Sequence, residues 1–126
     1  MLRKAFLSKS TKSIGDRFEK VAANYLKDQG VTLISKNFTA KYGEIDLIGL
    51  ERDILVFFEV RARSSTNLGR PEETVTAQKQ QRIRRTANKF LQTNTKYRNT
   101  LCRFDVISIV YSDTQHSIDW ITNAFQ

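Results

Sequence analysis

The sequence predicts one α/β domain built on a mixed central sheet of about five strands flanked by helices. Two kinds of pattern lead to this class. In two segments apolar residues recur at steps of three and four, which is typical of amphipathic helices, whereas other segments are apolar at nearly every position, as covered strands are. The segments follow one another in the order α, β, β, β, α, β, β, which is expected when helices pack on the faces of a sheet.

The first helix is predicted over residues 13–29. Ser13 can cap its start, and Gly30 suits a left-handed exit. Its apolar positions have helical spacing: Phe18, Val21, Ala22, Tyr25 and Leu26. Residues 1–12 contain four basic side chains and no acid, and we interpret them as a flexible basic arm that precedes a single domain over 13–126.

Three strands are predicted next, over 31–38, 43–50 and 54–64. The second and third are apolar at most positions, which indicates central strands. Residues 64–73 include Gly69 and the only proline, Pro71, so they predict a loop, and this loop could close over a substrate.

A second helix is predicted over 76–91, followed by a long strand over 101–111 and a short one over 117–121. The inner stripe of the helix is expected to contain Ile83, Ala87, Phe90 and Leu91. Asp105 is expected to form a structural ion pair with Arg103. Trp120 and Phe125 are expected to close the core, although an aromatic ring near a basic surface can also stack on unpaired bases.

The net charge of +8 is concentrated in two segments. Besides the basic arm, residues 74–104 contain eight lysines or arginines and no acid. Because much of this stretch is one helix, nucleic acid is the expected partner. The alternative is a basic helix face that only keeps the protein in solution.

Composition also excludes several classes of protein. No apolar run approaches the roughly 20 residues that a bilayer span needs, so no membrane association is expected, and the apolar stretch near the start is too short for a secretory signal. The single cysteine, Cys102, cannot form an internal disulfide, which fits the reducing cytoplasm. With one histidine and one cysteine, a zinc finger is excluded.

Carboxylates interrupt the two central strands. Alternation puts Glu44 and Asp46 on one side of the first of them, and Glu59 and Arg61 on one side of the second. If the strands pair as a hairpin, Asp46 and Glu59 can face each other, and two close carboxylates repel unless a cation lies between them. Their hard oxygen ligands favour Mg²⁺ or Mn²⁺. The alternative is solvated acids on the open face of an antiparallel sheet.

Two further acids are open to more than one interpretation. Glu19 lies at the edge of the apolar stripe of the first helix, where it could join Asp46 and Glu59 or form a salt bridge with a neighbouring base. Glu44 is expected mainly to cap a turn or to pair with a strand arginine.

Together these features resemble the PD-(D/E)xK nuclease superfamily, which has a restriction-endonuclease-like core and includes archaeal Holliday junction resolvases. More closely, the chain is similar to the YraN-type family of small bacterial proteins, which are classed as endonuclease-like. The resemblance covers about residues 13–125. Its carriers are Gly15, Glu19, Ala22, Asn37, residues 43–48 and 56–60, Gly69, Pro71, Lys79, Gln80, residues 103–106 and residues 123–125.

The resemblance implies roles for the candidate site. Asp46, Glu59 and the Val60 carbonyl would hold Mg²⁺ or Mn²⁺, Glu19 would orient water or a second ion, and Arg61 would face the phosphate. The catalytic set is then Glu19, Asp46, Glu59 and Arg61. Contacts to nucleic acid are expected from Arg63, Lys79, Gln80, Arg84 and Arg85. The alternative is that these side chains only form a solvated surface.

Two residues depart from the family pattern. Arg61 stands where the family usually has lysine, and Phe18 where it usually has glycine. Arginine keeps the positive charge and can bind a phosphate through two hydrogen bonds, but its pKa above ~12 prevents it from acting as a base. If the lysine acts electrostatically, Arg61 can replace it, whereas a role in proton transfer would be lost.

The leading hypothesis is therefore a metal-dependent endonuclease that acts on DNA, including branched or damaged DNA, through attack of a metal-activated water. A first alternative is a non-catalytic nucleic-acid-binding module whose nuclease site has degenerated at Arg61. A second is a scaffold whose basic helix binds an acidic protein. Cutting both strands of a junction would favour a homodimer.

Overall fold

The computed structural model describes the backbone of residues 2–66 and 75–126 and the side chains of residues 15–66 and 75–126. Most of the predicted loop, including Gly69 and Pro71, lies outside the described residues. The elements are α1 (Leu2–Asp28), β1 (Thr32–Ala40), β2 (Gly43–Glu51), β3 (Ile54–Ser64), α2 (Ala77–Thr93), the 3₁₀ turn η1 (Thr95–Tyr97), β4 (Leu101–Tyr111) and β5 (His116–Phe125). The predicted order α, β, β, β, α, β, β is confirmed.

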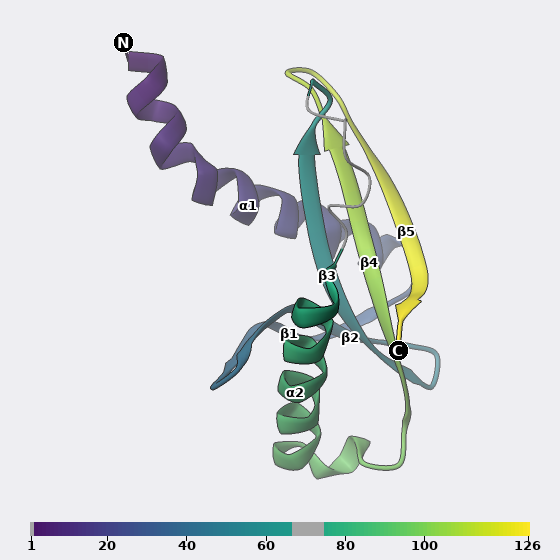
Figure 1. Ribbon diagram of the computed structural model, residues 1–126. Coiled ribbons are helices and arrows are strands. Elements are labelled where there is room, and N and C mark those ends of the chain that lie inside the picture. Colours follow the sequence, from purple (N-terminus) through teal and green to yellow (C-terminus); the bar gives the residue numbers. More distant parts are fainter. Residues whose placement is uncertain (1, 67–74) are drawn as a thin grey trace.

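The five strands form one sheet in the order β1-β2-β3-β4-β5 (Figure 1). β3 and β4 are parallel, and the other neighbours are antiparallel. The parallel pair needs a crossover, and α2 provides it. The prediction of a mixed five-stranded sheet is therefore confirmed.

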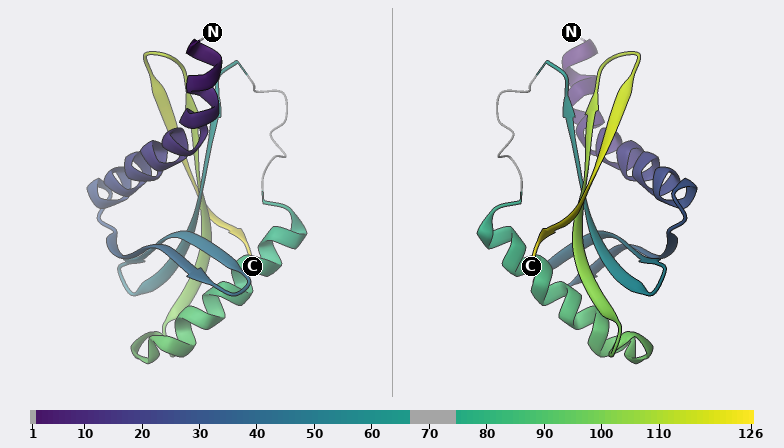
Figure 2. Two further views of the ribbon diagram at one scale, coloured as in Figure 1. Left: turned by 90° about the vertical axis from the view of Figure 1, so that its left-hand side faces the viewer. Right: turned by 90° about the vertical axis from the view of Figure 1, so that its right-hand side faces the viewer.

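The two helices cover opposite faces of this sheet, as Figure 2 shows with the sheet nearly edge-on. The core on the α1 side contains Phe18, Ala22, Ala23, Leu26, Val31, Leu47, Val56, Phe58, Ile107 and Ile109. The core on the α2 side contains Ile45, Ile48, Leu55, Phe57, Val75, Ile83, Ala87, Phe90, Val106 and Phe125. Both faces of β2 and β3 are thus covered, which explains why these strands are apolar at most positions.

Two element boundaries differ from the prediction by more than two residues. α1 begins at Leu2 rather than Ser13, because the residues before Ser13 include no proline or glycine that would stop a helix. The backbone of the predicted arm is therefore helical from Leu2 onward, and this part of α1 projects beyond the sheet (Figure 1). β5 runs to Phe125 rather than ending at Ile121.

The longer β5 is held by the buried Asp105 on β4. Arg103 Nε donates to Asp105 Oδ1 at 2.9 Å, which confirms the expected ion pair. The backbone N–H of Asn123 donates to the same oxygen at 2.8 Å, and Trp120 Nε1 donates to Oδ2 at 2.8 Å. These bonds carry β5 past a register shift opposite Phe104 and Val106, so that Phe125 reaches the core.

Within the described part of the chain, no helix is both long enough and apolar enough to cross a bilayer.

Candidate active site

The site lies where β2 and β3 separate. Their ladder runs from Glu51–Ile54 to Leu47–Phe58 and then stops, although one more step would pair Asp46 with Glu59. Instead, the Asp46 carboxylate takes the place of a backbone acceptor: its Oδ2 accepts a hydrogen bond from Val60 N at 2.8 Å. The expected hairpin register is confirmed, and it brings Asp46 and Glu59 to the same end of the ladder.

β2 turns about its own axis at Asp46. Ile45 and Leu47 are two residues apart, a spacing that normally puts side chains on one face, yet Ile45 packs in the α2-side core and Leu47 in the α1-side core. On β1 the residue between the partners of Ile45 and Leu47 is Asn37, whose φ of 52° lies in the left-handed region that asparagine tolerates. The irregular backbone leaves Asp46 at the boundary between the two faces.

Glu59 is buried on the α2 side of β3, with 6% of its surface exposed. Its Oε2 lies 2.5 Å from Lys79 Nζ, in the first turn of α2. This turn is fixed by Thr76, whose hydroxyl accepts a hydrogen bond from the backbone N–H of Lys79 at 3.2 Å. The helix cap therefore places an ammonium group directly beside a buried carboxylate.

Glu19 of α1 and Glu44 of β2 approach Asp46. One carboxylate oxygen from each of the three lies within 4.8 Å of the others. The amide of Asn37 joins the two outer acids when its nitrogen is turned toward them, donating to Glu19 Oε1 at 2.9 Å and to Glu44 Oε2 at 3.0 Å. Asn37 thus holds two like charges close together.

The pKa of Asp46 is raised from 3.8 to about 8, first because its carboxyl is buried and second because Glu59 is negatively charged. The hydrogen bond from Val60 acts in the opposite direction. Burial and the charge of Glu44 also raise the pKa of Glu19. A bound cation would offset the repulsion from neighbouring carboxylates and favour the ionised form of Asp46.

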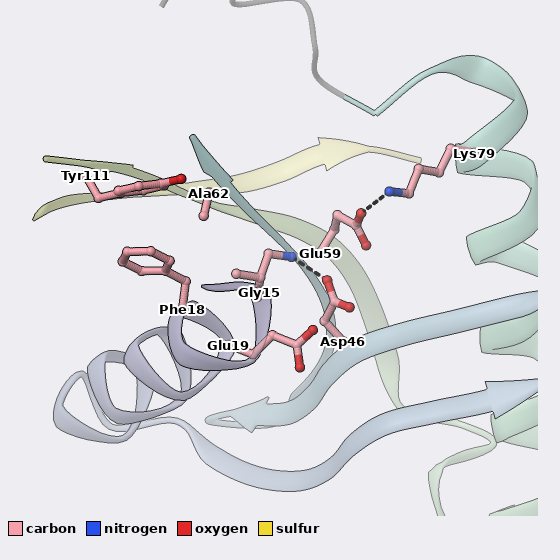
Figure 3. Close-up of a pocket in the computed structure, with 9 residues that line it drawn as sticks. Gly15, Phe18, Glu19, Asp46, Glu59, Ala62, Lys79 and Tyr111 are labelled. Atoms are coloured by element: carbon pink, nitrogen blue, oxygen red, sulfur yellow. Dashed lines mark hydrogen bonds and ion pairs between the residues drawn. The ribbon is translucent and has the colours of Figure 1, made fainter. Parts of the chain in front are cut away.

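An open pocket of about 390 Å³ is lined by Glu19, Asp46, Glu59 and Lys79 (Figure 3). In Figure 3 the side chains of Glu19, Asp46 and Glu59 point into the same space, and Lys79 reaches toward it from α2. The rings of Phe18 and Tyr111 stack at 4.6 Å and form one wall, so the phenylalanine that departs from the family pattern serves the core and the pocket wall together. We call this space the acidic pocket.

A second pocket of about 400 Å³ adjoins the acidic pocket and shares Asp46, Glu59 and Lys79 with it. Tyr42, Glu44 and Arg82 also line this second pocket. The carboxylates can therefore be reached from two sides.

The other residues predicted for the site line neither pocket. Arg61 and Arg63 are half-buried on β3 and line neither pocket. Gln80 Nε2 donates to the Val75 carbonyl at 3.0 Å, and Arg84 Nη1 donates to the Gln126 carbonyl at 2.9 Å, so both side chains have partners within the chain. Arg85 is exposed on α2.

Sequence reasoning missed three participants. It expected Glu44 mainly to cap a turn or to pair with a strand arginine, although the Glu44-Ile45-Asp46 alternation already contained the signal for two acids on one side. Asn37 gave a weak signal, because asparagine is a poor strand residue inside a predicted strand. Arg82 was counted only as part of the basic stretch.

The described donors fit a hard divalent cation. Three carboxylate oxygens are the ligands that Mg²⁺ and Mn²⁺ prefer. One oxygen from each of the three side chains lies within 4.8 Å of the others, so these residues could hold one such ion if their side chains moved inward.

The chain was compared with known proteins. A model described as uncharacterised protein family UPF0102 matches residues 18–109. A UPF0102 protein of Francisella tularensis subsp. tularensis (strain WY96-3418) is 42% identical over 116 residues, covering 91% of this chain and 96% of the relative. A UPF0102 protein of Coxiella burnetii (strain RSA 493 / Nine Mile phase I) is 44% identical over 116 residues, covering 92% and 94%. One of Pseudomonas aeruginosa (strain LESB58) is 39% identical over 118 residues, covering 92% and 94%. These names state no activity.

Proposed function

The chain belongs to the uncharacterised protein family UPF0102, the YraN-type proteins that it resembles, and we propose that it is a metal-dependent endonuclease that hydrolyses phosphodiester bonds in DNA. One observation carries this proposal. Four acids from α1, β2 and β3 gather around two adjoining open pockets with a lysine of α2: Glu19 lines the first, Glu44 the second, and Asp46, Glu59 and Lys79 line both. A purely structural cluster would be expected to pair its acids with bases rather than to gather like charges.

Asp46, Glu19 and Glu44 would hold Mg²⁺ or Mn²⁺. When bound, such an ion lowers the pKa of water and offsets negative charge on a phosphate. Asp46 is fixed by the Val60 backbone, and Asn37 joins the other two acids, so the ligands are oriented before an ion arrives. Glu59, which the resemblance makes a metal ligand, would in this proposal orient Lys79.

Lys79 supplies the positive charge that the resemblance assigned to position 61. Its ammonium lies at the acidic pocket, whereas Arg61 does not line that pocket. The Lys79 side chain is 46% exposed, so its ammonium can reach a phosphate oxygen and stabilise the negative charge there. The ion pair with Glu59 would keep the ammonium in position. This arrangement argues against the interpretation that Arg61 makes the site degenerate.

DNA is the proposed substrate because two cations of α2 line the second pocket beside the acids. Arg82 lines the second pocket together with Lys79, and both belong to the acid-free stretch between residues 74 and 104. A polyanion would be drawn to this side of the molecule, and its phosphates would meet the acids only with a cation between them.

A cleavage assay tests the proposal. Purified protein is incubated with linear duplex, single-stranded and four-way-junction DNA in Mg²⁺ or Mn²⁺. We expect cleavage of at least one substrate, and we expect Asp46→Asn and Glu44→Gln each to reduce the rate ~100-fold or more, since each removes a charged ligand.

Asp119→Asn is the matched control, because Asp119 is exposed on β5 and lines neither pocket. It should cleave like the unaltered protein. Absence of cleavage with every substrate and both metals, or full activity in Asp46→Asn, would overturn the proposal. Isothermal titration with Mn²⁺ tests the metal site independently of the substrate.

A further inference from the structure

Tyr42 stands out on the surface beside the acids. It lies in the two-residue turn between β1 and β2, where Ala40 pairs with Gly43, and 48% of its surface is exposed. A large ring at a hairpin tip contributes little to the core, and Tyr42 belongs to neither core cluster. Its position therefore requires another explanation.

Two cations hold the ring in place. The Arg85 guanidinium lies 5.0 Å from the ring centroid and Lys41 Nζ lies 5.7 Å from it, both within the range of a cation–π contact. The backbone is close to α2 as well, because a Cβ atom at Gly43 would lie 3.6 Å from Thr86 Oγ1. The turn is thus docked on α2 with its aromatic ring partly open to solvent.

A shallow groove of about 420 Å³ begins at this ring. The β1–β2 turn forms one side with Lys41 and Tyr42, and α2 forms the other with Arg85, Asn88, Lys89 and Gln92. Among the described residues that line it, none is acidic. We call it the basic groove.

The basic groove leads to the acids. Tyr42 also lines the second pocket, which contains Asp46, Glu59 and Lys79. Lys79, Arg82, Arg85 and Lys89 are spaced by three or four residues, so they form one stripe along α2. From Lys79 to Lys89 this stripe is about 15 Å long at ~1.5 Å per residue.

We propose that the basic groove binds a single strand of nucleic acid, with Tyr42 stacking on an unpaired base and the α2 stripe contacting the backbone. An exposed aromatic ring flanked by arginine and lysine, with amide side chains nearby, is the combination that single-strand sites use. A duplex offers no open base face to such a ring. The inference rests on the proposed function in one respect, since the held strand would be the one led into the acidic pocket.

Binding without cleavage provides the test. Fluorescence anisotropy is measured in EDTA with a labelled single strand of thirty nucleotides and with the duplex of the same sequence. We expect Tyr42→Ala to weaken binding of the single strand by roughly 5- to 150-fold, the effect of losing one stacked base, and to change binding of the duplex by less than about twofold. Tyr42→Phe should retain the affinity of the unaltered protein.

The backbone contacts have a separate readout. Lys89→Gln should reduce the slope of log affinity against log salt for the single strand by about 0.7. Lys27→Gln, which removes an equal charge from the exposed end of α1, should leave that slope unchanged. Photo-cross-linking with a 5-iododeoxyuridine-substituted strand should attach the strand to the peptide that contains Tyr42.

The proposal is overturned if Tyr42→Ala binds the single strand as the unaltered protein does, if it loses affinity for strand and duplex equally, or if neither nucleic acid binds. Failure of this proposal can be distinguished from failure of the nuclease proposal. Asp46→Asn should bind the single strand normally while failing to cleave, and Tyr42-dependent binding without any cleavage would retain the groove and reject the nuclease.

Discussion

Lys79 Nζ lies 2.5 Å from Glu59 Oε2, although the two residues are twenty positions apart in sequence and belong to α2 and β3. This contact puts an ammonium group at the acidic pocket, on the side opposite α1. Under the proposed function, the positive charge at the acids comes from Lys79 on the helix rather than from Arg61 on the strand.

The first prediction concerns these two bases. Lys79→Ala should reduce cleavage ~100-fold or more, because it removes the charge that stabilises the phosphate at the pocket. Arg61→Ala should have a much smaller effect, and Arg61→Lys should not increase the rate. Single-turnover cleavage rates for the three variants measure this, and a larger loss in Arg61→Ala than in Lys79→Ala would contradict the assignment.

The second prediction concerns pH and stability. The pKa of Asp46 is about 8 in the folded protein and near 3.8 in an unfolded chain, so the folded state binds more protons between these values. The free energy of unfolding should therefore fall as pH rises from about 4 to about 8. Asp46→Asn has no proton to lose, so its free energy of unfolding should exceed that of the unaltered protein by more at pH 8 than at pH 5.

Urea unfolding at the two pH values measures this effect. Each unit of pKa difference corresponds to about 1.4 kcal/mol, so the gain at pH 8 should be at least about 1 kcal/mol. The exposed Asp119→Asn should show no such dependence on pH. An Asp46→Asn protein with the pH profile of the unaltered protein would mean that Asp46 is ionised at neutral pH.

The third prediction concerns Asn37. Asn37→Gly keeps a backbone that tolerates the φ of 52° but removes the amide between Glu19 and Glu44. Affinity for Mn²⁺ should fall ~10-fold or more, because the two carboxylates then repel each other and lose their fixed orientation. Calorimetric titration measures this affinity, with Asn88→Gly on α2 as a control that should leave it unchanged.

The fourth prediction concerns the anchor of β5. Asp105→Ala leaves Arg103 and the Trp120 indole N–H without their buried partner and should cost roughly 3–5 kcal/mol of unfolding free energy. Trp120 is the only tryptophan, so its fluorescence reports the change directly. Asp119 is exposed on β5, so the unfolding free energy of Asp119→Ala should stay within about 0.5 kcal/mol of that of the unaltered protein.

Local patterns determined most of the fold. The apolar periodicity predicted both helices and all five strands, and the bounds of β3 and β4 agree with the structure. The end of β5 was missed because Asn123 and Ala124 are poor strand residues. The bond from the Asn123 N–H to the distant Asp105 helps to hold them in the sheet. Contacts of this kind leave no local signal.

The candidate site, like the fold, was predicted from the sequence only in part. A short hairpin fixes its own register, so the sequence by itself determined that Asp46 and Glu59 would meet. It also placed Arg61 on the side of Glu59, but a residue two positions along a strand is about 6.6 Å farther on, and Arg61 does not line the pocket.

Only the tertiary structure decided which partners complete the site. Lys79 meets Glu59, Asn37 joins Glu19 to Glu44, and Arg85 contacts the Tyr42 ring. Each of these three contacts links a helix to a strand or hairpin. The side chains on one strand or hairpin are related by local geometry, which the sequence encodes directly. The angle and height at which a helix crosses a sheet depend on how the whole core packs, and the chemistry at the pocket depends on that packing.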